Sequence, residues 1–99
     1  MNFFDNHKQF IDCDPRKDRG MPQVNCETMS KRCKATLPTW LIEGKSILDL
    51  GSCFGAYGHY ALLHGAKHYT GVELQKQFVD KSIELLAQHH TNFTIKQQD

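Results

Sequence analysis

The stretch SILDLGSCFGAYG, residues 46–58, constrains the fold more strongly than any other part of the sequence. It starts as an apolar run that contains Ile47, Leu48 and Leu50, which is typical of a short buried strand. Three glycines then follow within eight residues, from Gly51 to Gly58. Glycine permits tight bends and a close approach of backbone or ligand. The stretch therefore predicts a strand that ends in either a ligand site or a tight backbone crossing.

The segments after residue 45 alternate between strand and helix patterns. Strands are predicted at 46–50, 68–72 and 92–98, and helices at 56–64 and 75–90. The second of these helices should bury one apolar stripe, which consists of Phe78, Val79, Ile83, Leu86 and Ala87. Alternation of this kind implies parallel strands joined by right-handed helical crossovers. The sequence thus predicts an α/β fold with a partial Rossmann-like βαβαβ sheet.

Residues 1–45 have a different pattern and form a loop and helical segment before the sheet. We therefore divide the chain into residues 1–45 and 46–99. Residues 1–25 show no clean periodicity, and their prolines and glycine predict a loop. A helix is predicted over 27–36, followed by a short helical turn from Pro38 to Gly44. Within that turn, Trp40 and Leu41 are expected to anchor the core.

Composition restricts the classes of function. A net charge of +1 over 99 residues does not support a dedicated nucleic-acid module. No stretch is long and apolar enough for a membrane span, and the first residues lack the pattern of a secretory signal, so we expect a cytosolic protein without membrane contact. The four cysteines have no zinc-ligand spacing. We predict no metal, with a zinc site from Cys13, Cys26, Cys33 and a histidine as the less favoured alternative.

Two acidic residues end the first two predicted strands, where ligands of such folds bind. The dinucleotide fingerprint fails, because Cys53 and Ala56 stand where its second and third glycines would fall. Asp49 would repel a pyrophosphate but attract an ammonium group. Glu73 lies where an acid can bind both hydroxyls of a ribose. An ammonium group and a ribose together describe S-adenosylmethionine.

In these features residues 46–99 resemble the first half of the class I S-adenosylmethionine-dependent methyltransferases. The first motif of that family is an acid followed by three glycines at alternate positions. Asp49, Gly51 and Gly55 match it, and Cys53 stands in the middle glycine position. The resemblance implies a cofactor-binding set that consists of Asp49, Gly51, Ser52, Cys53, Phe54, Gly55, Glu73, Leu74 and Asp99.

The resemblance also implies a role for each part of this set. Asp49 would bind the ammonium group of the methionine, and the glycine turn would line the methionyl chain. Glu73 would accept bonds from the ribose hydroxyls, Leu74 would pack on the adenine, and Asp99 would receive its amino group. Catalytic residues would lie beyond Asp99, so none is assigned, and the methyl acceptor stays open.

Two other functions compete with this interpretation. One is a non-catalytic module that binds S-adenosylmethionine or another nucleoside, which would use the same acids. The other is an NAD-dependent oxidoreductase, which Asp49 and Cys53 disfavour. The family's sheet has seven strands and this chain supplies three, so the apolar first strand is expected to be a sheet edge. We therefore expect the isolated chain to self-associate and to transfer no methyl group by itself.

Overall fold

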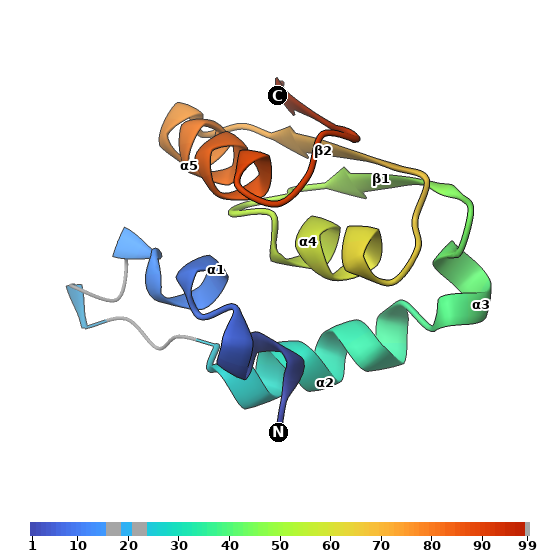
Figure 1. Cartoon of the computed structure of the whole chain (residues 1–99). Helices are drawn as coiled ribbons and strands as arrows, with labels where there is room; N and C mark the ends of the chain where they lie inside the picture. Colours follow the sequence, from blue (N-terminus) through green and yellow to red (C-terminus); the bar gives the residue numbers. More distant parts are fainter. Residues whose placement is uncertain (16–18, 21–23, 99) are drawn as a thin grey trace.

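The computed structural model describes residues 1–15, 19–20 and 24–98. Its centre is a sheet of three parallel strands in the order β1-β2-β3 (Figure 1). The strands are β1 (Ser46–Leu50), β2 (His68–Glu73) and β3 (Phe93–Gln97). This arrangement confirms the predicted α/β fold and its partial Rossmann-like sheet. Asp99, one of the predicted site residues, lies outside the described residues.

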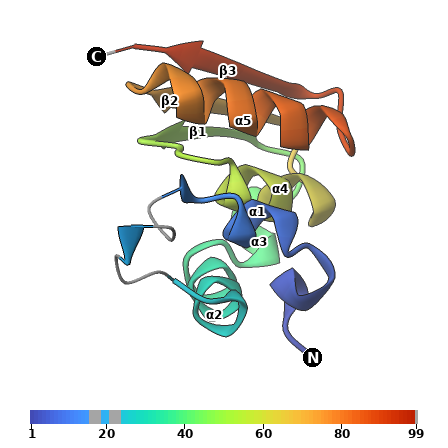
Figure 2. The same ribbon diagram turned by 90° about the vertical axis from the view of Figure 1, so that its left-hand side faces the viewer.

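Two helices connect the strands and lie on the same side of the sheet (Figures 1 and 2). They are α4 (Ala56–Leu63) and α5 (Lys76–Ala87). The helices cover the face to which β2 presents Tyr69, Gly71 and Glu73, and all three residues are buried. This alternation follows from the strand period of two residues. None of the helices among the described residues is long and apolar enough to cross a membrane.

The N-terminal part consists of short helices that pack below α4 and α5. They are η1 (Phe3–Asn6), α1 (Gln9–Asp12), α2 (Cys26–Thr36) and α3 (Thr39–Ile42). The Asn25 side chain accepts a hydrogen bond from the Thr28 N–H at 2.8 Å and caps the start of α2. The predicted helix over 27–36 is thus confirmed. The two helices before it were not predicted, because four residues are too few to establish a helical period.

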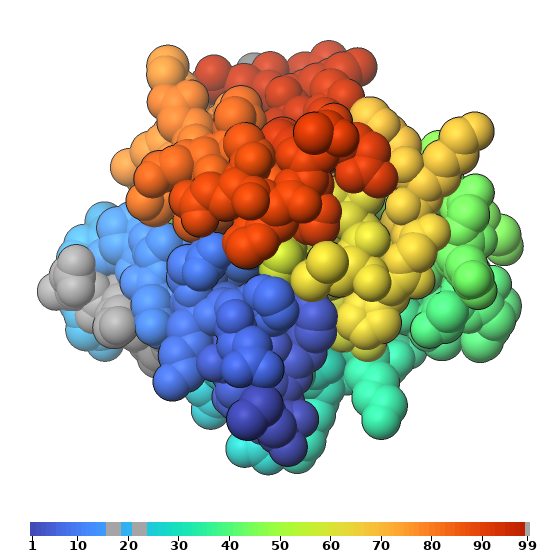
Figure 3. All heavy atoms as spheres, viewed as in Figure 1, coloured from blue at the N-terminus to red at the C-terminus, as the bar shows by residue number. Residues whose placement is uncertain are grey.

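One buried cluster joins the N-terminal helices to the sheet and its helices. Its largest members include Phe4, Phe10, Ile42, Tyr60, Tyr69 and Leu86. The space-filling view shows the N-terminal residues in direct contact with the end of α5 and with α4 (Figure 3). The hydrophobic core therefore extends from the N-terminal part through the helical layer to the covered face of the sheet.

The predicted core anchors of α3 were wrong. Trp40 is 76% exposed and Leu41 is 40% exposed, while Ile42 is fully buried. Three successive residues of a helix point in directions about 100° apart, so one short turn can direct only one of them to the core. The apolar run could not reveal which residue that was.

The apolar stripe of α5 was predicted partly in the wrong phase. Phe78, Val79 and Leu86 are buried as expected, whereas Ile83 is 40% exposed and Ala87 is also exposed. Leu85 and Ser82 complete the buried face instead. The serine is tolerated there because its hydroxyl donates a hydrogen bond to the Val79 carbonyl at 2.9 Å. Because Ser82 is polar, the pattern of apolar residues did not predict that its position lies on the buried face.

Candidate functional site

The glycine turn between β1 and α4 uses left-handed backbone at alternate positions. Gly51, Cys53 and Gly55 have φ angles of +76°, +53° and +84°. Cys53 is the non-glycine residue with positive φ in the described part of the chain. The Gly51 and Ser52 N–H groups both donate to the Val72 carbonyl, at 2.8 and 3.0 Å, and so tie the turn to the end of β2. The spacing of the glycines is thus set by the backbone conformation of the turn.

Asp49 lies one residue before the end of β1 and is half-buried. Its Oδ2 atom accepts a hydrogen bond from the Tyr69 hydroxyl at 2.6 Å. Burial raises the pKa of the Asp49 carboxyl, the Tyr69 hydrogen bond opposes this shift, and the nearby Glu73 carboxylate adds to it. The ionised carboxylate of Asp49 therefore lowers the stability of the folded chain, and a bound cation would reduce this loss of stability.

Tyr69 was not identified from the sequence as a site residue. It lies four residues before Glu73 on β2, so the strand period places both side chains on the covered face. Tyr69 is fully buried, and this burial, with the adjacent Asp49 carboxylate, raises the pKa of its hydroxyl. A second signal was Gly58, because a Cβ atom there would lie only 2.4 Å from the Tyr69 ring. Gly58 therefore allows α4 to pack closely on β2.

Glu73 is the last residue of β2, and its carboxylate stabilises the glycine turn through hydrogen bonds. Its Oε1 atom accepts a hydrogen bond from the Cys53 N–H, and its Oε2 atom accepts one from the Gln75 N–H, both at 2.9 Å. The residue is only 8% exposed. A carboxylate has about four acceptor sites, so two engaged oxygens still leave capacity for ligand hydroxyls. Glu73 is thus both a support of the turn and a candidate ligand residue.

Close packing also fixes the turn against its neighbours. A Cβ atom at Gly71 would lie 2.7 Å from the Ser52 Oγ atom, and one at Gly55 would lie 3.0 Å from Leu86 Cδ1. Ser52 is buried. In contrast, a Cβ atom at Gly51 would meet nothing within 4 Å. The turn is therefore packed on its inner side and open at Gly51, where a ligand can approach.

The structure directs the side chains of two other predicted residues, Leu74 and Phe54, into different surroundings. Leu74 is 58% exposed directly after Glu73, which leaves its side chain available to a ligand. Phe54 is turned away and buried, with its ring 4.7 Å from that of Phe78 on α5. Only the backbone of Phe54 therefore lies with the rest of the turn.

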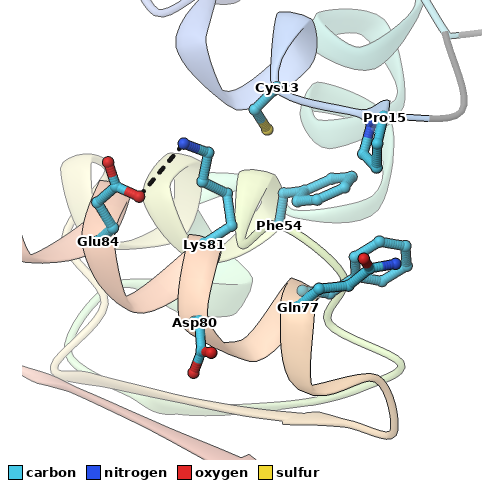
Figure 4. A pocket seen from close by; sticks show the side chains of 8 residues that line it. Cys13, Pro15, Phe54, Gln77, Asp80, Lys81 and Glu84 are labelled. Carbon is cyan, nitrogen blue, oxygen red and sulfur yellow. Dashed lines mark hydrogen bonds and ion pairs between the residues drawn. The ribbon is translucent and has the colours of Figure 1, made fainter. Parts of the chain in front are cut away.

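Phe54 borders a pocket of about 300 Å³ between α5 and residues 1–15, which we call the N-terminal segment (Figure 4). Cys13 and Pro15 form one wall of this pocket, and α5 forms the other. The Lys81 ammonium lies 3.2 Å from the Glu84 carboxylate at its edge. The pocket therefore lies on the α5 side of the turn, apart from the strand-end acids.

Burial dominates the surroundings of two of the four cysteines, Cys13 and Cys33. Within residues 1–15, 19–20 and 24–98, no three or more histidine, cysteine or acidic side chains are placed to hold a metal ion. Burial raises the pKa of the Cys33 thiol to about 12 and that of Cys13 to about 11. In the metal-free chain these raised pKa values keep both thiols protonated at neutral pH.

Comparison with solved structures identifies the fold. An RNA methyltransferase assigned in Pyrococcus horikoshii matches 77% of this chain and 37% of its own at 33% identity and a TM-score of 0.68. An S-adenosylmethionine-dependent methyltransferase from Mesorhizobium loti matches 71% of this chain and 30% of its own at 28% identity and a TM-score of 0.59. PRMT6, solved with S-adenosylhomocysteine, matches 69% of this chain and 19% of its own at 26% identity and a TM-score of 0.56.

The sequence alone gives no such match: no protein-family model matches it, and no curated protein matches it significantly. The chain spans well under half the length of the three solved chains. The chain therefore has the partial Rossmann-like α/β fold of the class I S-adenosylmethionine-dependent methyltransferases.

Proposed function

We propose that this chain binds S-adenosylmethionine as the cofactor-binding portion of a methyltransferase. The observation that carries the proposal is the pair of carboxylates, Asp49 and Glu73, at the ends of neighbouring parallel strands on either side of the glycine turn. The fold of solved S-adenosylmethionine-dependent methyltransferases supports it. The methyl acceptor is not defined by these residues, and the cytosol remains the proposed location on the sequence argument alone.

The residues of the turn suit the parts of this cofactor. Asp49 would take the ammonium group, Glu73 the ribose hydroxyls, and the exposed Leu74 the adenine face. The open space above Gly51 would admit the methionyl chain. When bound, S-adenosylmethionine supplies a methyl group activated by its sulfonium. The chain's own contribution is to bind and orient that group, and positioning is a large part of catalysis in such transfers.

Electrostatics favour a cationic ligand over a dinucleotide. Glu73 is close enough to Asp49 to raise the pKa of its carboxyl, so two negative charges act on one another at this edge. A pyrophosphate would add negative charge to that pair, whereas an ammonium or sulfonium group would reduce the repulsion. An NAD-dependent oxidoreductase is accordingly disfavoured.

Binding of S-adenosylhomocysteine to matched variants tests the proposal. Calorimetry should give a clear affinity for the wild type and a loss of about 10-fold or more in Glu73→Gln, because charge-assisted hydrogen bonds contribute about 1.5–3 kcal/mol. Asp80→Asn is the control, since Asp80 pairs with Lys76 on the exposed face of α5. Thermal melting of the ligand-free variants separates lost binding from lost support of the turn. Equal affinities in the two variants would remove Glu73 from the site.

Two further measurements separate the competing functions. A thermal-shift comparison should show stabilisation by S-adenosylhomocysteine and none by NAD; stabilisation by NAD alone would favour the oxidoreductase. Methyl transfer is expected only from a protein that also carries the remainder of the fold. A longer protein that binds the cofactor and transfers no methyl group to any acceptor class would favour the non-catalytic module.

A further inference from the structure

Four histidines meet where the N-terminal segment contacts the ends of α4 and α5. His7 lies between η1 and α1, His59 lies in the first turn of α4, and His89 and His90 follow α5. His59 is fully buried, and the Phe10 ring stacks on it at 4.3 Å with an interplanar angle of 15°. In the space-filling view these regions of the chain are in direct contact (Figure 3).

Three of these rings form a chain of hydrogen bonds. His59 Nε2 lies 2.9 Å from His7 Nδ1, and His59 Nδ1 lies 2.8 Å from His90 Nε2. Because the two nitrogens of His59 face different partners on opposite sides of its ring, the rings do not converge on one metal position. His89 Nε2 contacts the Gln9 side chain at 2.9 Å. The contacts therefore tie the N-terminal segment to α4 and to the end of α5.

The three hydrogen-bonded histidine rings can hold only a limited number of protons. Each contact needs one hydrogen, and each neutral imidazole supplies one donor and one acceptor. Three neutral rings satisfy both contacts, and one extra proton can be placed on the outer nitrogen of His7 or His90. A second extra proton would set two N–H groups against each other in one of the contacts. Acidification must therefore break at least one of the two hydrogen bonds between these rings.

We propose that His7, His59 and His90 form an acid-sensitive clamp that holds the N-terminal segment against α4 and α5 when neutral and releases it when protonated. The described groups that act electrostatically on His59 are all histidines, namely His7, His90 and His89, and no carboxylate among them offsets a positive charge. The His59 backbone N–H donates to the Gly55 carbonyl at 2.9 Å, so His59 lies one helical turn after the last residue of the glycine turn. The segment also carries Cys13 and Pro15, one wall of the pocket beside Phe54.

The direction of the pH effect follows from the shifts of the three rings. Burial, and repulsion between the rings, lower the pKa of His59 to about 3 and lower those of His7 and His90. The closed form therefore binds fewer protons than the open form, whose histidines have an ordinary pKa of about 6.5. Stability of the clamp is present above that value and is lost as the pH falls below it.

Amide hydrogen exchange of the full 99-residue chain between pH 7.5 and 5.5 tests the clamp. The reporter amides are those of η1 and α1, and the reference amides are those of β2. Protection factors, which correct for intrinsic exchange, should fall by about 100-fold or more in the N-terminal helices if two or more extra protons are bound on opening. Protection in β2 should change little. A parallel loss in β2, or no loss in the N-terminal helices, would overturn the proposal.

A pair of substitutions removes titration while it retains the contacts. His7→Asn replaces a ring that bonds through Nδ1, and His90→Gln replaces one that bonds through Nε2, so each amide can keep the bond to His59. The double variant should lose only about 10-fold protection over the same range, because His59 alone then titrates. The control is His68→Gln on the sheet, where the histidine contacts Thr94; it should behave as the wild type. Equal pH dependence of the double variant and the wild type would overturn the clamp, and if the double variant does not fold, the wild-type comparison decides alone.

Discussion

The two faces of the sheet differ sharply in what they bury. On the covered face, Tyr69, Gly71 and Glu73 lie beneath α4, the glycine turn and α5, and each makes a specific contact. On the other face, Leu48 is 64% exposed and Leu50 is 74% exposed. Both faces belong to the same three strands, so the difference comes from the two crossovers, which place their helices on one side.

This difference separates residues that specify the site from residues that only supply apolar surface. The covered face combines charge, hydrogen bonds and close packing, so a small change there should alter stability or binding. The other face, called the bare face below, leaves Leu48 and Leu50 exposed, so the same kind of change there should alter mainly association. Four substitutions test this contrast.

The largest effect is expected from Gly58→Ala on the covered face. An alanine Cβ would lie 2.4 Å from the Tyr69 ring, which is fully buried and cannot move freely. Overpacking of this kind costs about 1–3 kcal/mol, although glycine to alanine inside a helix usually stabilises by about 1 kcal/mol. We therefore expect a lower free energy of unfolding in a urea titration. An increase would mean that α4 does not pack on β2 as closely as described.

The second effect concerns Asp49→Asn, which should change stability and binding in opposite directions. Burial raises the pKa of the Asp49 carboxyl, so its charge lowers stability above that pKa and the loss is relieved as the pH falls through it. Asparagine removes the charge and still offers an oxygen to the Tyr69 hydroxyl. We expect a higher melting temperature at neutral pH and an affinity for S-adenosylhomocysteine that is about 10-fold lower.

A matched control keeps this result interpretable. Asp12→Asn changes an exposed acid of the N-terminal segment and should alter neither quantity. If Asp49→Asn lowered the melting temperature and left the affinity unchanged, Asp49 would be a support of the turn and would not bind the ligand.

A smaller effect is expected from Cys53→Gly within the turn. Cys53 has a φ of +53°, and this left-handed conformation costs an L-residue about 1–2 kcal/mol. Glycine avoids that cost but loses more entropy on folding, so a net gain of about 0.5–1 kcal/mol is expected in the free energy of unfolding. Gly51→Ala, at a φ of +76° with open space around it, should give a loss of similar size. Two changes of the same sign would show that backbone conformation does not control the turn.

Much of the sheet could be predicted from the sequence because local patterns determine it. The apolar run before Gly51 and the acid at Glu73 mark two strand ends, and the order of strands and helices implies the parallel topology. The same patterns could not identify Tyr69, because its role depends on the Asp49 carboxylate of another strand. The second function of Glu73, to accept the Cys53 N–H, also depends on contacts distant in the sequence.

The N-terminal part was harder to predict for a different physical reason. Its first two helices have four residues each and depend on packing of Phe4 and Phe10 into the shared cluster. Helices this short gain little from their own hydrogen bonds, so tertiary contacts decide whether they form. The histidine cluster depends on the same packing, because its members His7, His59, His89 and His90 come from distant parts of the sequence. The spacing of these histidines in the sequence therefore could not predict their contacts.

The smallest effect on stability is expected from Leu50→Thr on the bare face. Surface substitutions of this kind usually change the free energy of unfolding by less than about 0.5 kcal/mol. The effect on association should be larger, because Leu48 and Leu50 form an apolar strip on the edge strand β1, and unpaired apolar edges favour association between chains. We propose that the isolated chain self-associates along β1, and light scattering after size-exclusion chromatography should then show smaller particles for Leu50→Thr. Leu63→Thr is the matched control, since Leu63 is 49% exposed but lies on α4. A wild-type chain that is monomeric at the same concentration, or an equal effect of both substitutions, would mean that the bare face does not drive association.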